Sequence, residues 1–143
     1  MIVNNFSIFH KLVFLKKEYI KLVKKMKLTI ENDNDIVIMN IKEANVGTEI
    51  APDLKSKVLI EAQPNIRALI FNLENVETMD SSGLGALLLA NRQLRNYSIP
   101  VCIVKAQQFV KNLFSMTKID SLFLFFDTEE QAIEYIKKNG RIN

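Results

Sequence analysis

Met79-Asp80-Ser81-Ser82-Gly83-Leu84-Gly85-Ala86-Leu87-Leu88-Leu89 is a polar turn followed at once by the start of a long apolar helix. The run before the turn, residues 68–73, is short, apolar and bounded by polar residues, which predicts a strand covered on both faces. After the turn, leucines recur at helical spacing, at positions 84, 87, 88 and 94. We therefore predict that a helix starts close to Ser81 or Ser82.

The serines of the turn, Ser81 and Ser82, are compatible with two different roles, phosphorylation and helix capping. A helix N-terminus leaves N–H groups unpaired and carries a partial positive charge, which suits an anion, and phosphorylation of Ser82 would place about two negative charges there. Alternatively, Asp80 or Ser81 caps the helix and the glycines let it pack closely. Residue chemistry alone favours capping, because it is the commoner role of such residues.

From Met26 onward, strands alternate with helices. Predicted strands cover residues 28–31, 36–41, 68–73, 99–104 and 122–126, and predicted helices lie between Pro52 and Pro64 and over 82–96, 108–116 and 129–136. The turn-tolerant residues 32–35 make the first two strands a hairpin, and the helix 108–116 is expected to turn Phe109, Leu113 and Met116 inward. The alternation predicts an α/β fold with a largely parallel sheet and crossover helices.

Several segments together resemble the STAS domains, in particular the small bacterial anti-sigma factor antagonists. The segments are residues 79–85, Val76-Glu77-Thr78 before them, Ile99-Pro100-Val101-Cys102-Ile103-Val104, and the runs 110–119 and 122–132, in the family's order and spacing. The resemblance covers residues 26–136. It implies the STAS fold, a small mostly parallel, mixed sheet packed against crossover helices.

The resemblance also implies a site and a function. The second serine of the Asp-Ser-Ser-Gly turn is the family's phosphoacceptor, which corresponds to Ser82, with Asp80 orienting its hydroxyl and Gly83 admitting the partner's backbone. The expected turn and partner contacts are Asp80, Ser81, Gly83, Leu84 and Gly85. The implied partners are an anti-sigma factor serine kinase and a metal-dependent serine phosphatase. Cofactors belong to those partners, so none is expected in this chain, and the implied location is the cytoplasm.

One loop departs from the family pattern. Antagonists usually carry Gly-x-Leu-Asp before the first helix. Here residues 42–49 form a longer segment, and Gly47 falls near the place of the aspartate. Glu43 or Glu49 could replace the carboxylate of that aspartate. We expect a partner-facing loop that includes Glu43, Gly47, Thr48 and Glu49. The departure supports an alternative function, a constitutive docking or scaffold module in which Ser82 only caps the helix.

Charge and composition divide the chain into a short extension and one domain. At 143 residues with 48% hydrophobic and 24% charged residues, the chain has an ordinary globular composition, and its lone Cys102 excludes an internal disulfide and predicts a buried thiol. Of the net charge of +3, residues 1–25 carry +5 and residues 26–143 carry −2. A basic segment at one end does not make a nucleic-acid-binding domain, so we exclude that function.

Residues 1–25 are predicted to form a basic amphipathic helix. Apolar residues alternate with its lysines, namely Phe9, Leu12, Val13, Leu15, Tyr19, Ile20, Leu22 and Val23. Such a helix could lie on an anionic membrane surface or dock on the domain, and Met26 is an alternative translation start. No run of apolar residues is long enough for a membrane span.

The residues needed for catalysis do not come together in this sequence. Ser82 lies outside any Gly-x-Ser-x-Gly pattern, and the sole histidine, His10, is in the extension. Gly83-Leu84-Gly85 lacks the third glycine of a dinucleotide site, and one cysteine with one histidine makes a thiolate or imidazole metal site improbable. We predict no catalytic residue and no metal site, and therefore a binding protein rather than an enzyme.

Overall fold

The computed structural model describes residues 5–22 and 25–139 of the chain. It contains a five-stranded sheet in the order β1-β2-β4-β6-β7. The strands are β1 (Leu28–Asp33), β2 (Ile36–Ile41), β4 (Ala68–Asn72), β6 (Val101–Val104) and β7 (Leu124–Phe126). β1 and β2 are antiparallel, and the remaining neighbours are parallel. The predicted hairpin and the largely parallel sheet are confirmed.

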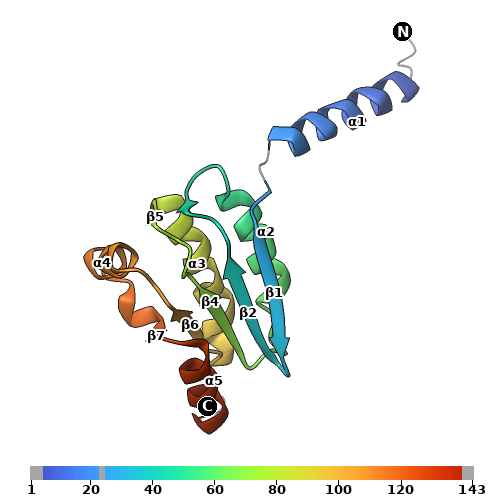
Figure 1. Cartoon of the computed structure of the whole chain (residues 1–143). Helices are drawn as coiled ribbons and strands as arrows, with labels where there is room; N and C mark the ends of the chain where they lie inside the picture. Colours follow the sequence, from blue (N-terminus) through green and yellow to red (C-terminus); the bar gives the residue numbers. More distant parts are fainter. Residues whose placement is uncertain (1–4, 23–24, 140–143) are drawn as a thin grey trace.

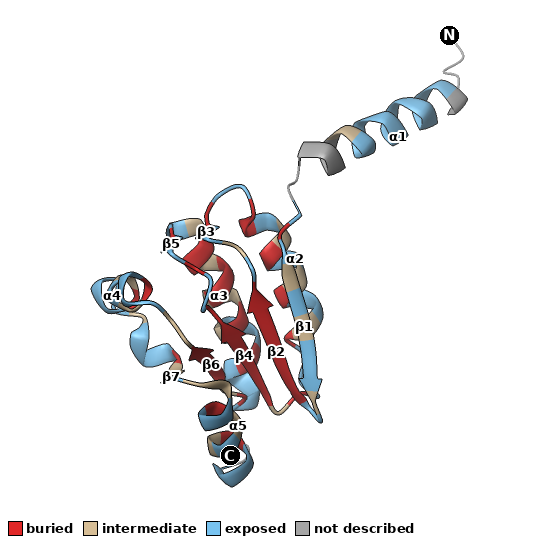
Figure 2. Ribbon diagram, in the orientation of Figure 1, coloured by how far each residue is buried: buried red, intermediate tan, exposed pale blue. Residues whose placement is uncertain are grey.

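Helices cover both faces of this sheet. α2 (Ala51–Glu61) and α3 (Ser81–Leu94) pack together on one face, and α5 (Glu129–Asn139) lies on the other (Figure 1). All residues of β2, β4 and β6 are buried, as expected of strands covered twice (Figure 2). Alternate residues divide between two cores: Met39 and Phe71 pack on the α2 and α3 side, whereas Ile38 and Ile70 face Ala132 and Ile136 of α5.

Local chemistry sets the ends of these elements. Asn34 adopts a positive φ of 58° in the tight turn between β1 and β2, a conformation that asparagine tolerates well. β1 consequently runs two residues further than predicted. Pro52 lies in the first turn of α2, where backbone N–H groups have no partner within the helix, so its lack of an N–H removes no hydrogen bond. The last strand starts at Leu124 rather than at Leu122, because a short 3-10 helix, η2 (Asp120–Leu122), precedes it.

The predicted inward face of α4 (Gln108–Met116) is wrong. Phe109 and Met116 are 55% and 79% exposed, and Leu113 is only partly buried. Val110 and Phe114 are the buried residues of this helix. The ring of Phe114 makes edge-to-face contacts with Phe123 and Phe125, with centroids 5.3 and 5.4 Å apart. One of these aromatic neighbours directly precedes the last strand and the other lies within it, and their contacts with Phe114 determine which of the two apolar stripes of the helix is buried.

The N-terminal extension forms α1 (Asn5–Leu22), which stands apart from the sheet (Figures 1 and 2). The predicted helix is confirmed over these residues. Val23 of the predicted apolar pattern lies outside the described residues, as do the side chains of Tyr19, Ile20 and Leu22. Within the described ranges, no helix combines the length and the apolar character needed to cross a bilayer.

Candidate functional site

Two very short strands bring the loop after β2 against the serine turn. β3 (Asn45–Val46) pairs in parallel with β5 (Thr78–Met79), the pair of residues directly before Asp80. The Thr78 hydroxyl donates to the Asn45 side-chain oxygen over 2.9 Å, and the Asp80 N–H donates to the Val46 carbonyl over 3.3 Å. This small sheet cannot be predicted from the sequence, because strands of two residues are too short to show an alternation of apolar and polar residues.

Asp80 is the N-cap of α3. Its Oδ1 accepts the N–H groups of Ser82 and Gly83 at 2.8 and 3.0 Å, and its Oδ2 accepts the N–H and the hydroxyl of Thr48 at 3.1 and 3.2 Å. The hydrogen bond from the Gly83 N–H is the largest influence that lowers the pKa of Asp80, and those from Thr48 and Ser82 act the same way. The carboxylate therefore stays ionised, and its hydrogen bonds connect the start of α3 with the loop that carries Thr48.

Ser82 is the second residue of α3 and takes no part in the cap through its side chain. Its Oγ lies 3.4 Å from the Thr48 Oγ1, and the residue is only partly buried. The expectation that Asp80 orients the Ser82 hydroxyl is wrong, since that carboxylate accepts the backbone N–H instead. Ser82 is also no helix cap, contrary to the alternative reading. Its hydroxyl is available to a partner, with Thr48 as its neighbour.

Gly83 serves the packing of this chain rather than the approach of a partner. The residue is buried, and a Cβ placed on it would overlap the carbonyl oxygen of Val46 and come within 2.8 Å of Met79 Cγ. Gly85 differs, because a Cβ there meets no described atom within 4 Å. Leu84 was expected to contact a partner, but it is 5% exposed and belongs to the core. The accessible residues of the predicted turn are Asp80, Ser81, Ser82 and Gly85.

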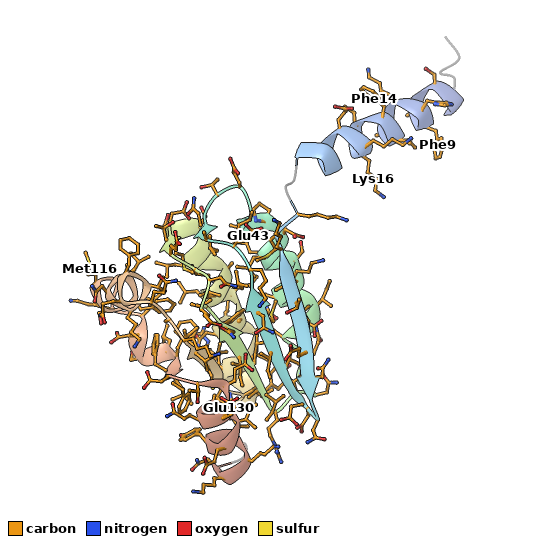
Figure 3. All side chains as sticks on the ribbon, in the orientation of Figure 1. Phe9, Phe14, Lys16, Glu43, Met116 and Glu130 are labelled. Atoms are coloured by element: carbon orange, nitrogen blue, oxygen red, sulfur yellow. The ribbon has the colours of Figure 1, made fainter. Side chains whose placement is uncertain are left out.

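The loop that departs from the family pattern wraps around Asp80. A Cβ at Gly47 would lie 3.0 Å from Asp80 Oδ2, so any side chain at this position would crowd the Asp80 carboxylate. Glu43, Gly47, Thr48, Glu49 and Asp80 all line one surface depression of about 440 Å³. Glu43 lies beside the start of β1, where it accepts the Lys27 N–H over 2.8 Å (Figure 3). Three carboxylates thus give this depression an acidic lining.

A comparison with known protein families identifies the domain. Residues 27–132 match the family model of the STAS domain. The chain belongs to the STAS domain family. Its match begins directly after Met26 and includes the serine turn and the loop of residues 42–49. STAS domains are typically binding modules rather than enzymes. Among the described residues, no group of three or more histidine, cysteine or acidic side chains is placed to hold a metal ion.

Solved structures of anti-sigma factor antagonists have the same fold as this chain. The anti-sigma factor antagonist SpoIIAA in its unphosphorylated form is 20% identical with a TM-score of 0.63, and the match covers 78% of this chain and 98% of SpoIIAA. SpoIIAA from Bacillus also matches in its phosphorylated form, with a TM-score of 0.62 and 20% identity over 77% of this chain and 99% of that one. An anti-sigma factor antagonist domain protein from Planctomyces limnophilus is 15% identical with a TM-score of 0.71, over 79% of this chain and 99% of that one.

The STAS fold also occurs inside a much longer protein. The murine anion transporter solute carrier 26 family member A9 is 12% identical with a TM-score of 0.70. The match covers 94% of this chain but only 26% of the transporter. At these identities the structural likenesses establish the fold that the proteins share.

Proposed function

We propose that this STAS protein is an anti-sigma factor antagonist whose binding to a kinase-type anti-sigma factor is controlled by phosphorylation of Ser82. The unphosphorylated chain binds the anti-sigma factor and so frees a sigma factor for transcription in the bacterial cytoplasm. Phosphorylation by that same partner ends the interaction, and a metal-dependent serine phosphatase restores it. The kinase supplies the ATP site and its magnesium, so this chain acts as substrate and binding partner rather than as an enzyme.

The observation that supports the proposal is that Asp80, and not Ser82, caps α3 with its side chain. Asp80 makes the cap of α3, so the Ser82 hydroxyl is not needed to hold the helix. Ser82 is partly exposed in the first turn of α3, and its hydroxyl lies beside the loop that carries Thr48. A serine placed in this way can be modified without loss of the fold, which is what a reversible switch requires.

The local charges explain why a phosphate would act on the partner rather than on the fold. The N–H groups of Ser82 and Gly83 already donate to Asp80, so they are not free to receive the phosphate. The phosphate would also lie near the acidic depression that Glu43, Glu49 and Asp80 line. It would therefore remain hydrated and point outward, where burying it against a partner carries a desolvation cost and adds like-charge repulsion.

Substitutions at the two neighbouring serines test the proposal. In calorimetric titrations with a kinase-type anti-sigma factor, we expect Ser82→Ala to retain the affinity of the wild type and Ser82→Asp to lose about tenfold or more. With magnesium and ATP present, the kinase should label the wild type and the matched control Ser81→Ala, but not Ser82→Ala. Equal affinities of the two Ser82 variants, or undiminished labelling of Ser82→Ala, would contradict the assignment.

A second candidate function is a docking module that does not switch. The observation that favours it is the likeness to a segment that makes up about a quarter of an anion transporter, so the same fold also occurs as one part of a longer chain. In this case Ser82 carries no phosphate, and Ser82→Ala and Ser82→Asp bind a partner equally. The titrations above separate the two functions.

A further inference from the structure

α1 exposes apolar side chains along its described length. Six of them are each at least 36% exposed, namely Ile8, Phe9, Leu12, Val13, Phe14 and Leu15. In the rest of the described chain, large apolar residues with this degree of exposure are spread over several elements, namely Leu59, Ile60, Tyr97, Phe109, Met116 and Leu122. Large apolar side chains held in water on a separate helix indicate that the helix has a binding surface.

The apolar side chains of α1 are concentrated on one side. At 3.6 residues per turn, Ile8, Phe9, Leu12 and Leu15 fall within an arc of roughly 120°. Phe14 is five residues from Phe9 and therefore points about 140° away from it. Figure 3 shows these two phenylalanines on different sides of the helix. The arc of Ile8, Phe9, Leu12 and Leu15 is the apolar face of α1.

Two exposed lysines lie at this apolar face. By the same geometry, Lys11 falls about 40° outside the arc, beyond Leu15, and Lys16 falls within it, between Leu12 and Phe9. The extension of residues 1–25 holds six lysines against one glutamate, whereas the remaining residues have a net charge of −2. The net positive charge thus lies in the same segment that exposes the apolar face, and a helix that combines the two binds an anionic lipid surface.

We propose that α1 binds the surface of an anionic phospholipid bilayer and lies parallel to it. Ile8, Phe9, Leu12 and Leu15 enter the boundary between headgroups and acyl chains, and Lys11 and Lys16 reach the lipid phosphates. Pairing of α1 with a second copy fits less well. The helix spans 18 residues, fewer than the three to four heptads that indicate a coiled coil. Pairing would also bring Lys16 of both copies close to the seam.

Vesicle flotation of the full chain tests this proposal independently of Ser82. We expect the wild type to bind vesicles of mixed phosphatidylglycerol and phosphatidylcholine about tenfold or more tightly than vesicles of phosphatidylcholine alone, and added salt to weaken the binding. Phe9→Ser should weaken binding about tenfold, and the matched control Phe14→Ser much less. Lys11→Glu with Lys16→Glu should abolish the preference for anionic vesicles, whereas Lys42→Glu with Lys55→Glu, two exposed lysines of the domain, should leave it.

Three results would overturn the proposal. The first is equal binding to anionic and neutral vesicles, and the second is equal loss of binding in Phe9→Ser and Phe14→Ser. The third is a wild type that ignores both vesicles and sediments as a dimer that Leu12→Ser disperses, because α1 would then pair with a second copy. The side chains substituted on α1 are exposed on a helix that stands apart from the sheet, and Lys42 and Lys55 are exposed on the domain. An unchanged unfolding temperature therefore verifies that the domain is intact in every variant.

Discussion

Gly83→Ala tests how the serine turn is held in place. A methyl group at this position overlaps the Val46 carbonyl oxygen and approaches Met79 Cγ to 2.8 Å, and both neighbours are buried. The overlap involves backbone, so α3 and β3 must move apart, and overpacking of this kind costs about 1–3 kcal/mol. Alanine regains about 1 kcal/mol through its better helix propensity. With the overpacking cost at its upper end, we expect a net loss of about 2 kcal/mol in the free energy of unfolding.

Gly85→Ala is the matched control, two residues further along the same helix. A methyl group there meets no described atom within 4 Å, so only the gain in helix propensity remains, and we expect stabilisation by about 0.5–1 kcal/mol. Urea-induced unfolding followed by circular dichroism measures both variants. The two changes should have opposite signs. A Gly83→Ala variant as stable as Gly85→Ala would refute the close packing of α3 on β3.

Three further predictions follow from the core and from the cap. Folding lowers the pKa of Asp80 below its ordinary value of 3.8. The ionised carboxylate therefore stabilises the folded state above pH 3.8, and this stabilisation is lost as the pH falls through the lower pKa of the folded state. The difference in urea midpoint between the wild type and Asp80→Ala should therefore narrow in acid, and a constant difference would contradict the cap. Phe114→Ala should cost about 3–5 kcal/mol in chemical unfolding, whereas Met116→Ser should change stability by less than about 0.5 kcal/mol. Burial raises the pKa of Cys102 to about 12, so iodoacetamide should label this thiol near neutral pH only after unfolding, and labelling of the folded chain would be inconsistent with its burial.

The sequence predicts the main sheet well because its central strands are buried on both faces. Continuous apolar runs such as residues 68–73 are bounded by polar residues, so their position is clear from the pattern alone. α4 shows where the pattern fails. Phe109, Leu113 and Met116 have the spacing of an inward face, but Val110 and Phe114 compete with them. Only the position of neighbouring aromatic residues decides between the two stripes.

The sequence predicts which residues form the candidate site, but it does not predict the contacts that they make. Asp80, Ser81 and Ser82 can all cap a helix, and only the backbone geometry shows that Asp80 does so. Thr48 was expected in a partner-facing loop, but its bonds to Asp80 and its closeness to the Ser82 hydroxyl depend on pairing across more than thirty residues of sequence. No local pattern carries such information.

Control of binding by Ser82 is tested by comparing the full chain carrying phosphoserine at position 82 with the unmodified chain. Both would be titrated into a kinase-type anti-sigma factor, and the unfolding temperature of each would be measured alongside. We expect phosphorylation to weaken binding at least about tenfold and to leave the unfolding temperature nearly unchanged, because the phosphate acts at the interface. Equal affinity of the two forms would contradict the proposed switch, as would a phosphorylated chain that loses binding only because it unfolds.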